Sequence, residues 1–274
     1  WRFLFGALIA LGVFWLKRRP RPPLEAFRFH TARGLIQLST AALFFYALTN
    51  LRLAEATTIG FTAALMVPFV ARLLLGESIS RTALLATIIG FAGAALAVSG
   101  QPATHISGNR TLGLIACFSS ALLYALILVM LRMRALREDP TTIAMFTNVV
   151  PALVLLPASI ILPLFSMVGW TPAAWSNPDW ADLPVFLLLG FMGYLVWFLM
   201  TLAYARAPAQ RLAPLEYSAL VWSALIGFVL FDERPDWRLW AGAIAIIASC
   251  LIVAFEDHFR TRRAAQMPAS DLPE

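Results

Sequence analysis

The chain alternates between long apolar blocks and short polar connections, and this pattern predicts helices that cross a membrane. Nine blocks are candidate spans, at residues 1–16, 35–50, 55–75, 82–99, 111–131, 141–165, 183–205, 208–231 and 237–256. A span needs about 20 apolar residues, and most of the blocks reach that length. Because unpaired backbone groups are costly in lipid, the expected fold class is an all-α integral membrane protein with nine transmembrane helices present.

Composition agrees with this pattern. Of the 274 residues, 60% are hydrophobic and only 13% are charged, whereas about 25% of the residues of a soluble domain are charged. The charged residues gather in the connections between blocks, so an ordinary soluble domain is excluded.

Lys and Arg predict the orientation of the chain in the membrane. If the first block starts outside and the blocks alternate, 16 of the 21 Lys and Arg residues fall inside, which leaves five outside. Basic connections stay in the cytoplasm, so we expect a cytoplasmic C-terminus. The net charge of +6 then reflects loops that face an anionic leaflet, and no nucleic acid partner is expected.

The blocks also repeat. A shift of 156 residues places 55–75 on 211–231 and 82–99 on 238–255; the evidence is the matching pattern of blocks and not residue identity. An odd number of helices per copy makes the copies enter from opposite sides, so we expect two inverted five-helix repeats. Residues 1–99 form the first repeat with four of its five helices, 100–110 an outside connection, 111–256 the second repeat, and 257–274 a disordered cytoplasmic tail. The first helix of a ten-helix parent is expected to be absent.

Three stretches carry a resemblance to a known family: 1-WRFLFGALIALGVF-14, 59-IGFTAALMVPFVARLLLGESISRTALLATIIGFAGAALAV-98 and 215-LEYSALVWSALIGFVLFDERPDWRLWAGAIAIIASCLIVAF-255. They resemble the drug/metabolite transporter (DMT) superfamily, EamA-like family. The features that recur are an Arg-Phe pair, a glutamate after a helix in each copy, and small residues in the helix that follows: Arg2, Phe3, Glu77, Glu233, Ala86, Gly93, Gly242 and Ser249. The second copy departs from the first, with Asp-Glu in place of Gly-Glu.

The resemblance implies a ten-helix DMT fold with pseudo-twofold symmetry and a central cavity that opens alternately to each side. It implies a secondary transporter of a small organic metabolite, amino-acid-like, riboflavin-like or S-adenosylmethionine-like, with coupling to protons as a further expectation. Whether a chain without the family's first helix transports is left open.

Glu216 is the most unusual polar residue, because it lies seven or eight residues into the apolar block 208–231, about 10 Å along a helix. A carboxylate inside a membrane helix is a candidate for function, through binding a proton or a cationic solute. The alternative is structural, with the side chain reaching the cytoplasmic face or pairing with Arg211. The matching position in the first copy is Gly60.

Aromatic and polar residues of the blocks, together with kinks in the helices, complete the expected cavity. The candidates for substrate or proton binding are Glu216, Tyr217, Ser218, Trp222, Gly60, Phe61, Thr62, Pro68, Tyr124, Asn148, Tyr194 and Trp197. Aromatic faces with hydrogen-bonding tips suit a ring-bearing or cationic solute. Each of these residues alone is equally consistent with packing, and each proline with a simple kink.

Catalytic chemistry has little support. His30, His105 and His258 are expected on loops or at a helix end without metal-ligand spacing, and Cys117 and Cys250 lie inside apolar blocks. We therefore expect no enzyme, no catalytic residue, no metal and no cofactor. The expected partners are a small-molecule substrate and the lipid bilayer, in a monomer or homodimer of the bacterial inner membrane. A non-transporting subunit or a membrane enzyme remains the alternative.

Overall fold

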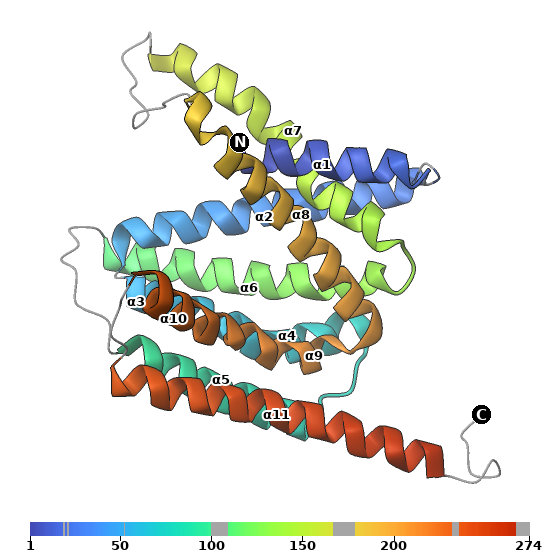
Figure 1. Cartoon of the computed structure of the whole chain (residues 1–274), viewed down its shortest axis with the longest axis vertical. Helices are drawn as coiled ribbons and strands as arrows, with labels where there is room; N and C mark the ends of the chain where they lie inside the picture. Colours follow the sequence, from blue (N-terminus) through green and yellow to red (C-terminus); the bar gives the residue numbers. More distant parts are fainter. Residues whose placement is uncertain are drawn as a thin grey trace. The chain divides into compact units, whose positions relative to one another are not determined.

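The structure is a computed structural model, and it describes residues 1–18, 20, 22–51, 53–99, 109–166, 179–231 and 236–266. Within these residues all the regular elements are helical (Figure 1). They are α1 (Arg2–Leu16), α2 (Leu24–Asn50), α3 (Leu53–Gly60), α4 (Thr62–Leu75), α5 (Arg81–Ser99), α6 (Arg110–Ala135), α7 (Pro140–Ser166), η1 (Trp180–Asp182), α8 (Leu183–Arg206), α9 (Ala209–Leu212), η2 (Ala213–Tyr217), α10 (Ser218–Phe231) and α11 (Trp237–Gln266).

Helices stand at each of the apolar blocks, and four of the described helical segments are long and apolar enough to cross a membrane. These four are Ala56–Leu75, Arg110–Ala135, Pro140–Pro157 and Trp180–Arg206. Shorter apolar helices cover Arg2–Leu16, Arg81–Ala97 and Trp237–Ile252. Length and composition thus support several spans, while the number of crossings and the inverted repeat stay predictions.

Two boundaries differ from the sequence-based expectation. Helix α2 begins at Leu24 and not near residue 35, because its first three turns mix charged and apolar residues and form a helix without being apolar throughout. His30, expected on a loop, therefore lies inside a helix. Helix α11 continues to Gln266, so residues 257–266 of the expected tail are helical, and 267–274 lie outside the described residues.

The chain divides into two compact units, and each contains helices from both expected repeats. Unit 1 comprises Trp1–Ser39 and Met130–Arg206, and unit 2 comprises Thr40–Val129 and Ala207–Glu274. The long helices α2 and α6 each contribute residues to both units.

In unit 1, α1 packs against both α7 and α8. The approach of α1 to α8 is close at Gly6 and Gly190: a Cβ atom added to Gly190 would lie 2.7 Å from the Gly6 nitrogen and 2.6 Å from the Cβ of Phe5. Contact at this distance leaves no room for a larger side chain. Small residues of this kind let helices approach in lipid, where dispersion and not the hydrophobic effect drives packing.

A polar network ties α2 to the end of α6 and the start of α7 in unit 1. The Nε2 atom of His30 lies 2.7 Å from Oε2 of Glu138, and the His30 ring is stacked on Phe146 with 4.7 Å between ring centroids. Arg134 lies 3.1 Å from carboxylate oxygens of both Glu138 and Glu25.

Burial lowers the pKa of His30 from its ordinary value of 6.5, although the hydrogen bond to Glu138 acts in the opposite direction. Burial alone would raise the pKa of Glu138, but the hydrogen bond with His30 and the charge of Arg134 hold it below its ordinary value. At neutral pH a neutral imidazole therefore donates from Nε2 to an ionised carboxylate.

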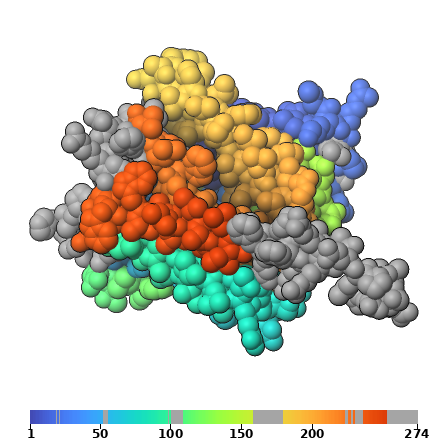
Figure 2. All heavy atoms as spheres, turned by 60° about the horizontal axis from the view of Figure 1, so that its bottom comes forward, coloured from blue at the N-terminus to red at the C-terminus, as the bar shows by residue number. Residues whose placement is uncertain are grey.

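In unit 2, α5 packs antiparallel against the N-terminal part of α11, as Figures 1 and 2 show. A Cβ atom added to Gly93 would lie 2.8 Å from the carbonyl oxygen of Gly242, and one added to Gly242 would lie 2.7 Å from the Cβ of Ala97. Ala86 and Ser249 of the same two helices are fully buried. The recurring small residues are thus the packing surface between these helices.

Replacing Gly242 by Leu is expected to destabilise the protein by about 1–3 kcal/mol, because the added atoms collide with the backbone of α5. The measurement is thermal unfolding of the purified protein in detergent. Gly12→Leu is the matched control, since a Cβ at Gly12 meets no atom within 4 Å. Equal unfolding temperatures for the two variants would contradict the packing described for α5 and α11.

The His30–Glu138 contact predicts a pH-dependent stability. Both groups hold protons less readily folded than unfolded, so the contribution of His30 is complete above its unfolded pKa of 6.5 and is lost as the pH falls through the folded value. Glu138 behaves in the same way at lower pH. The unfolding temperature should therefore fall between about pH 7 and about pH 5, and His30→Gln should flatten this dependence.

Glu25→Gln provides the control for this experiment. The Glu25 side chain is 84% exposed, and exposed ion pairs contribute little to stability. This variant should keep the pH dependence of the unmodified chain. A His30→Gln protein with an unchanged dependence would show that the network does not govern stability in this pH range.

Candidate functional site

Two helices of unit 2 are interrupted at positions that correspond in the two expected repeats. The first interruption is at Phe61, between the end of α3 at Gly60 and the start of α4 at Thr62. The second is a change of helix type at Tyr217, where the 3₁₀ segment η2 passes directly into α10 without a gap in the helical run. The two positions differ by 156 residues, which is the offset of the repeat.

The two interruptions lie against each other. The hydroxyl of Tyr217 donates a hydrogen bond of 3.3 Å to the carbonyl oxygen of Phe61, and the two ring centroids are 5.6 Å apart. The same carbonyl oxygen accepts from the amide of Ala64 at 3.2 Å, three residues ahead and not the four of an α-helix, so the Tyr217 hydroxyl is its second donor. The contact therefore stabilises the break in one helix with a residue from the break in the other.

Local sequence explains the second break better than the first. Pro214 stands at the start of η2, and proline has no amide hydrogen to donate to the helix. The first break has no proline beside it: Pro68 lies inside α4, which continues through it without interruption. The hydroxyl of Thr62 instead donates to the carbonyl oxygen of Ile59 at 2.5 Å, one turn back across the break.

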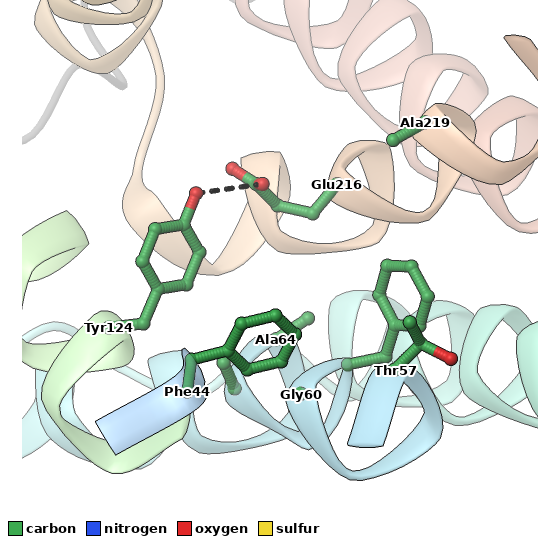
Figure 3. Close-up of a pocket in the computed structure, with 9 residues that line it drawn as sticks. Phe44, Thr57, Gly60, Ala64, Tyr124, Glu216 and Ala219 are labelled. Atoms are coloured by element: carbon green, nitrogen blue, oxygen red, sulfur yellow. Dashed lines mark hydrogen bonds between the residues drawn. The ribbon is translucent and has the colours of Figure 1, made fainter. Parts of the chain in front are cut away.

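A cavity of about 250 Å³ lies beside these breaks (Figure 3). Its walls come from α2, α3, α4, α6, η2 and α10, through Phe44, Thr57, Gly60, Phe61, Ala63, Ala64, Tyr124, Glu216 and Ala219. Glu216 enters from η2 and Tyr124 from α6, and the Tyr124 hydroxyl donates to Oε2 of Glu216 at 3.3 Å. The carboxylate belongs to the same stretch as the second helix break.

Glu216 has few partners for a half-buried carboxylate. Tyr124 is its hydrogen-bond partner among the described residues, and that bond uses one of its two oxygens. The other lining residues offer alkyl groups, aromatic faces and the Thr57 hydroxyl. A carboxylate in such surroundings is stabilised by a cation or a proton. The described residues contain no group of three or more His, Cys, Asp or Glu side chains suited to a metal ion.

The cavity brings together four of the residues named from the sequence: Glu216, Gly60, Phe61 and Tyr124. Four others lie close by in the chain without lining it. Tyr217 is fully buried behind the cavity and Ser218 begins α10, while Thr62 begins α4 and Pro68 is buried within that helix. Trp222 does not line the cavity, and its side chain is 62% exposed on α10.

The other three named residues, Asn148, Tyr194 and Trp197, lie in unit 1 and are not among the residues that line this cavity. Asn148 donates to the carbonyl oxygen of Ala144 in its own helix. Tyr194 stacks on Phe198, with 6.0 Å between ring centroids. Trp197 lies over the guanidinium of Arg33, with 5.2 Å from Cζ to the ring centroid.

Five residues of the cavity wall were missed, because they are common apolar or small residues with no distinctive chemistry. They are Phe44, Thr57, Ala63, Ala64 and Ala219. The repeat offset was a usable signal for one pair, since Ala63 and Ala219 are 156 residues apart. Side-chain identity alone could not separate Phe44 from the other phenylalanines of the chain.

Comparisons with known proteins extend these observations. The sequence model of the EamA-like transporter family matches residues 1–99 and 111–255. The chain is similar to an S-adenosylmethionine uptake transporter of Rickettsia felis, with 25% identity over 257 residues, covering 93% of this chain and 81% of the relative. It is also similar to riboflavin transporters of Brucella anthropi (25% identity, 96% and 89% covered) and Rhizobium johnstonii (29% identity, 97% and 82% covered).

A solved crystal structure has the same fold. It superposes with a TM-score of 0.74 and covers 92% of this chain and 86% of its own, at 19% sequence identity. The matched family, the transporter relatives and the apolar helices agree with one another. The chain therefore belongs to the EamA-like transporter family, and it is a multi-pass membrane protein that transports small molecules.

Proposed function

We propose that the chain is a secondary transporter that moves a small organic metabolite across the bacterial inner membrane by alternating access. In this proposal the solute binds in the unit 2 cavity, with Glu216 and Tyr124 as its polar contacts. The chain crosses the membrane nine times and ends in the cytoplasm. It acts as a monomer or homodimer, and its binding partners are the solute and the lipid bilayer.

The pair of corresponding helix breaks carries this proposal. Transporters built from inverted repeats bind their substrates where interrupted helices of the two copies meet. Phe61 separates α3 from α4, and Tyr217 ends the 3₁₀ segment before α10. The two residues are 156 positions apart and contact each other next to the cavity. A pseudo-twofold axis that passes between these two residues accounts for that contact.

The packing of α5 on α11 supports the same symmetry. Under the 156-residue offset, Gly93 corresponds to Ser249 and Ala86 corresponds to Gly242. Gly93 faces Gly242 in the structure, so a twofold axis would also bring Ala86 to Ser249, and both of these residues are fully buried. The burial of Ala86 and Ser249 supports this proposal.

Glu216 suggests what the solute carries. The carboxylate stands opposite the aromatic rings of Phe44 and Phe61, a combination that favours a positively charged group with apolar surroundings. A proton can occupy the same oxygen when the solute is absent, which would couple transport to protons. The corresponding position in the first repeat, Gly60, lines the same cavity but has no side chain. The carboxylate of Glu216 is therefore present in one repeat and has no counterpart in the other.

The relatives indicate which solutes to test first. S-adenosylmethionine has a positively charged centre and riboflavin has a large ring system, and the relatives are named for these two compounds. A carboxylate between aromatic walls fits the first through charge and the second through ring contacts. Amino acids and nucleosides complete a panel in which charge and ring size vary separately.

We expect Glu216→Gln to weaken binding of a positively charged solute about tenfold or more, because the variant removes the charge from the hydrogen-bonded site. The measurement is the shift in unfolding temperature produced by amino acids, nucleosides, flavins and S-adenosylmethionine at pH 6 and pH 8. Glu25→Gln, an exposed acid in unit 1, is the control and should bind normally.

A solute that stabilises the unmodified chain and Glu216→Gln equally at both pH values would make Glu216 structural. Proton coupling requires a pH dependence of binding that the unmodified chain shows and the variant loses. If no compound of the panel produces a shift, the cavity does not bind solutes of these classes.

Filling the cavity gives a second prediction. A Cβ atom at Gly60 would lie 3.4 Å from Cε2 of Phe44, an ordinary contact, so alanine is accommodated there. Leucine has three side-chain carbon atoms more than alanine, and we expect them to extend into the cavity. We expect Gly60→Ala to bind solute nearly as the unmodified chain does, and Gly60→Leu to lose binding while it stays folded. Normal binding by Gly60→Leu would place the solute elsewhere.

A further inference from the structure

Unit 1 buries a guanidinium group without pairing it to a carboxylate. Arg33 of α2 is only 1% exposed. Its Nη2 donates to the Thr147 hydroxyl at 2.5 Å, and its Cζ lies 5.2 Å from the centroid of the Trp197 ring. No described residue accepts a hydrogen bond from its Nη1.

The partners that Arg33 has do not neutralise its charge. The Thr147 hydroxyl is neutral, and its own hydrogen is donated to the carbonyl oxygen of Ile143 at 2.7 Å. The indole of Trp197 offers a π face and no acceptor atom. Glu138 is near enough to act on Arg33 through its charge, but its carboxylate is bound by His30 and Arg134.

Further polar atoms on the same face of α2 also lack partners. His30, Arg33 and Gln37 are spaced so that they share one face of the helix. Nδ1 of His30 and Oε1 of Gln37 are buried without a hydrogen-bond partner among the described residues. Buried polar atoms are nearly always paired, because an unpaired one costs about 1–3 kcal/mol. Of these three atoms, Nη1 of Arg33 is a donor that an anionic ligand can satisfy, whereas Nδ1 of the neutral His30 and Oε1 of Gln37 are acceptors that need a donor.

We propose that Arg33, through its unpaired Nη1 donor, binds the carboxylate group of a small organic anion. A guanidinium presents a planar fork of N–H donors that matches a carboxylate, and one positive charge balances one negative charge. A phosphate dianion would need a second free cation, whereas the nearby Arg134 is occupied by Glu25 and Glu138. Trp197, which is 9% exposed, covers the guanidinium and would contact the apolar part of the anion.

This site goes beyond the proposed function, because it lies in the other unit and binds the opposite charge. It does not depend on the Glu216 cavity, and Glu216→Gln should leave it unchanged. The two proposals therefore fail separately.

The test uses the full chain, purified in detergent, and the matched probes benzoate and benzamide, which have one shape and differ in charge. At equal concentration and constant ionic strength, benzoate should raise the unfolding temperature and benzamide should not. Arg33→Gln should weaken benzoate binding about tenfold or more, because it removes charged hydrogen bonds. Arg33→Lys keeps the positive charge but lacks the planar fork of N–H donors. Its affinity for benzoate should lie between those of the unmodified chain and Arg33→Gln.

Arg206→Gln is the matched control, since Arg206 is an exposed arginine of unit 1 that bonds to its own helix. It should bind benzoate as the unmodified chain does. The proposal would be overturned if benzoate and benzamide shifted the unfolding temperature equally. It would also be overturned if Arg33→Gln and Arg206→Gln lost benzoate affinity to the same extent. If Arg33→Gln does not fold, normal benzoate binding by Arg33→Lys overturns it. Inorganic phosphate is the remaining probe, and binding tighter than that of benzoate would overturn the assignment to a carboxylate.

Discussion

The need to pair polar groups inside an apolar protein governs both units of this structure. Lipid offers no hydrogen bonds, so each buried donor or acceptor must find its partner within the protein. Backbone groups are satisfied by forming helices throughout the described residues. The few polar side chains buried among these helices therefore indicate either a polar network that fixes helix positions or a binding site.

The two units meet this constraint in different ways. In unit 1 the network of Glu25, His30, Arg134 and Glu138 pairs acids with bases, while Nδ1 of His30 stays without a partner among the described residues. In unit 2 Glu216 is left with a single phenol. The network of unit 1 stabilises the positions of α2, α6 and α7. The Glu216 carboxylate of unit 2 can still bind a cation or a proton.

Interrupted helices make the arrangement in unit 2 possible. At the break, the carbonyl oxygen of Phe61 accepts from the amide of Ala64 and also from the hydroxyl of Tyr217. The same break and its counterpart at Tyr217 bring Gly60 and Glu216 to one cavity. Helices α5 and α11, which pack closely at Gly93 and Gly242, both contact η2 and so support this part of unit 2.

Much of the fold follows from the sequence, because apolar block length determines helices in lipid and does not depend on which helices become neighbours. The blocks, the repeat offset of 156 and the exceptional character of Glu216 could all be read from the chain. Pro68 was a candidate for a helix kink beside the cavity, but α4 continues through it. The break in this part of the chain is at Phe61, which has no neighbouring proline. The start of α2 was also missed, since its first turns are not apolar, and with it the burial of His30 and Arg33. Only the tertiary structure decided that Tyr124 reaches Glu216 and that Arg33 lacks a carboxylate, because these facts depend on which side chains meet across separate helices.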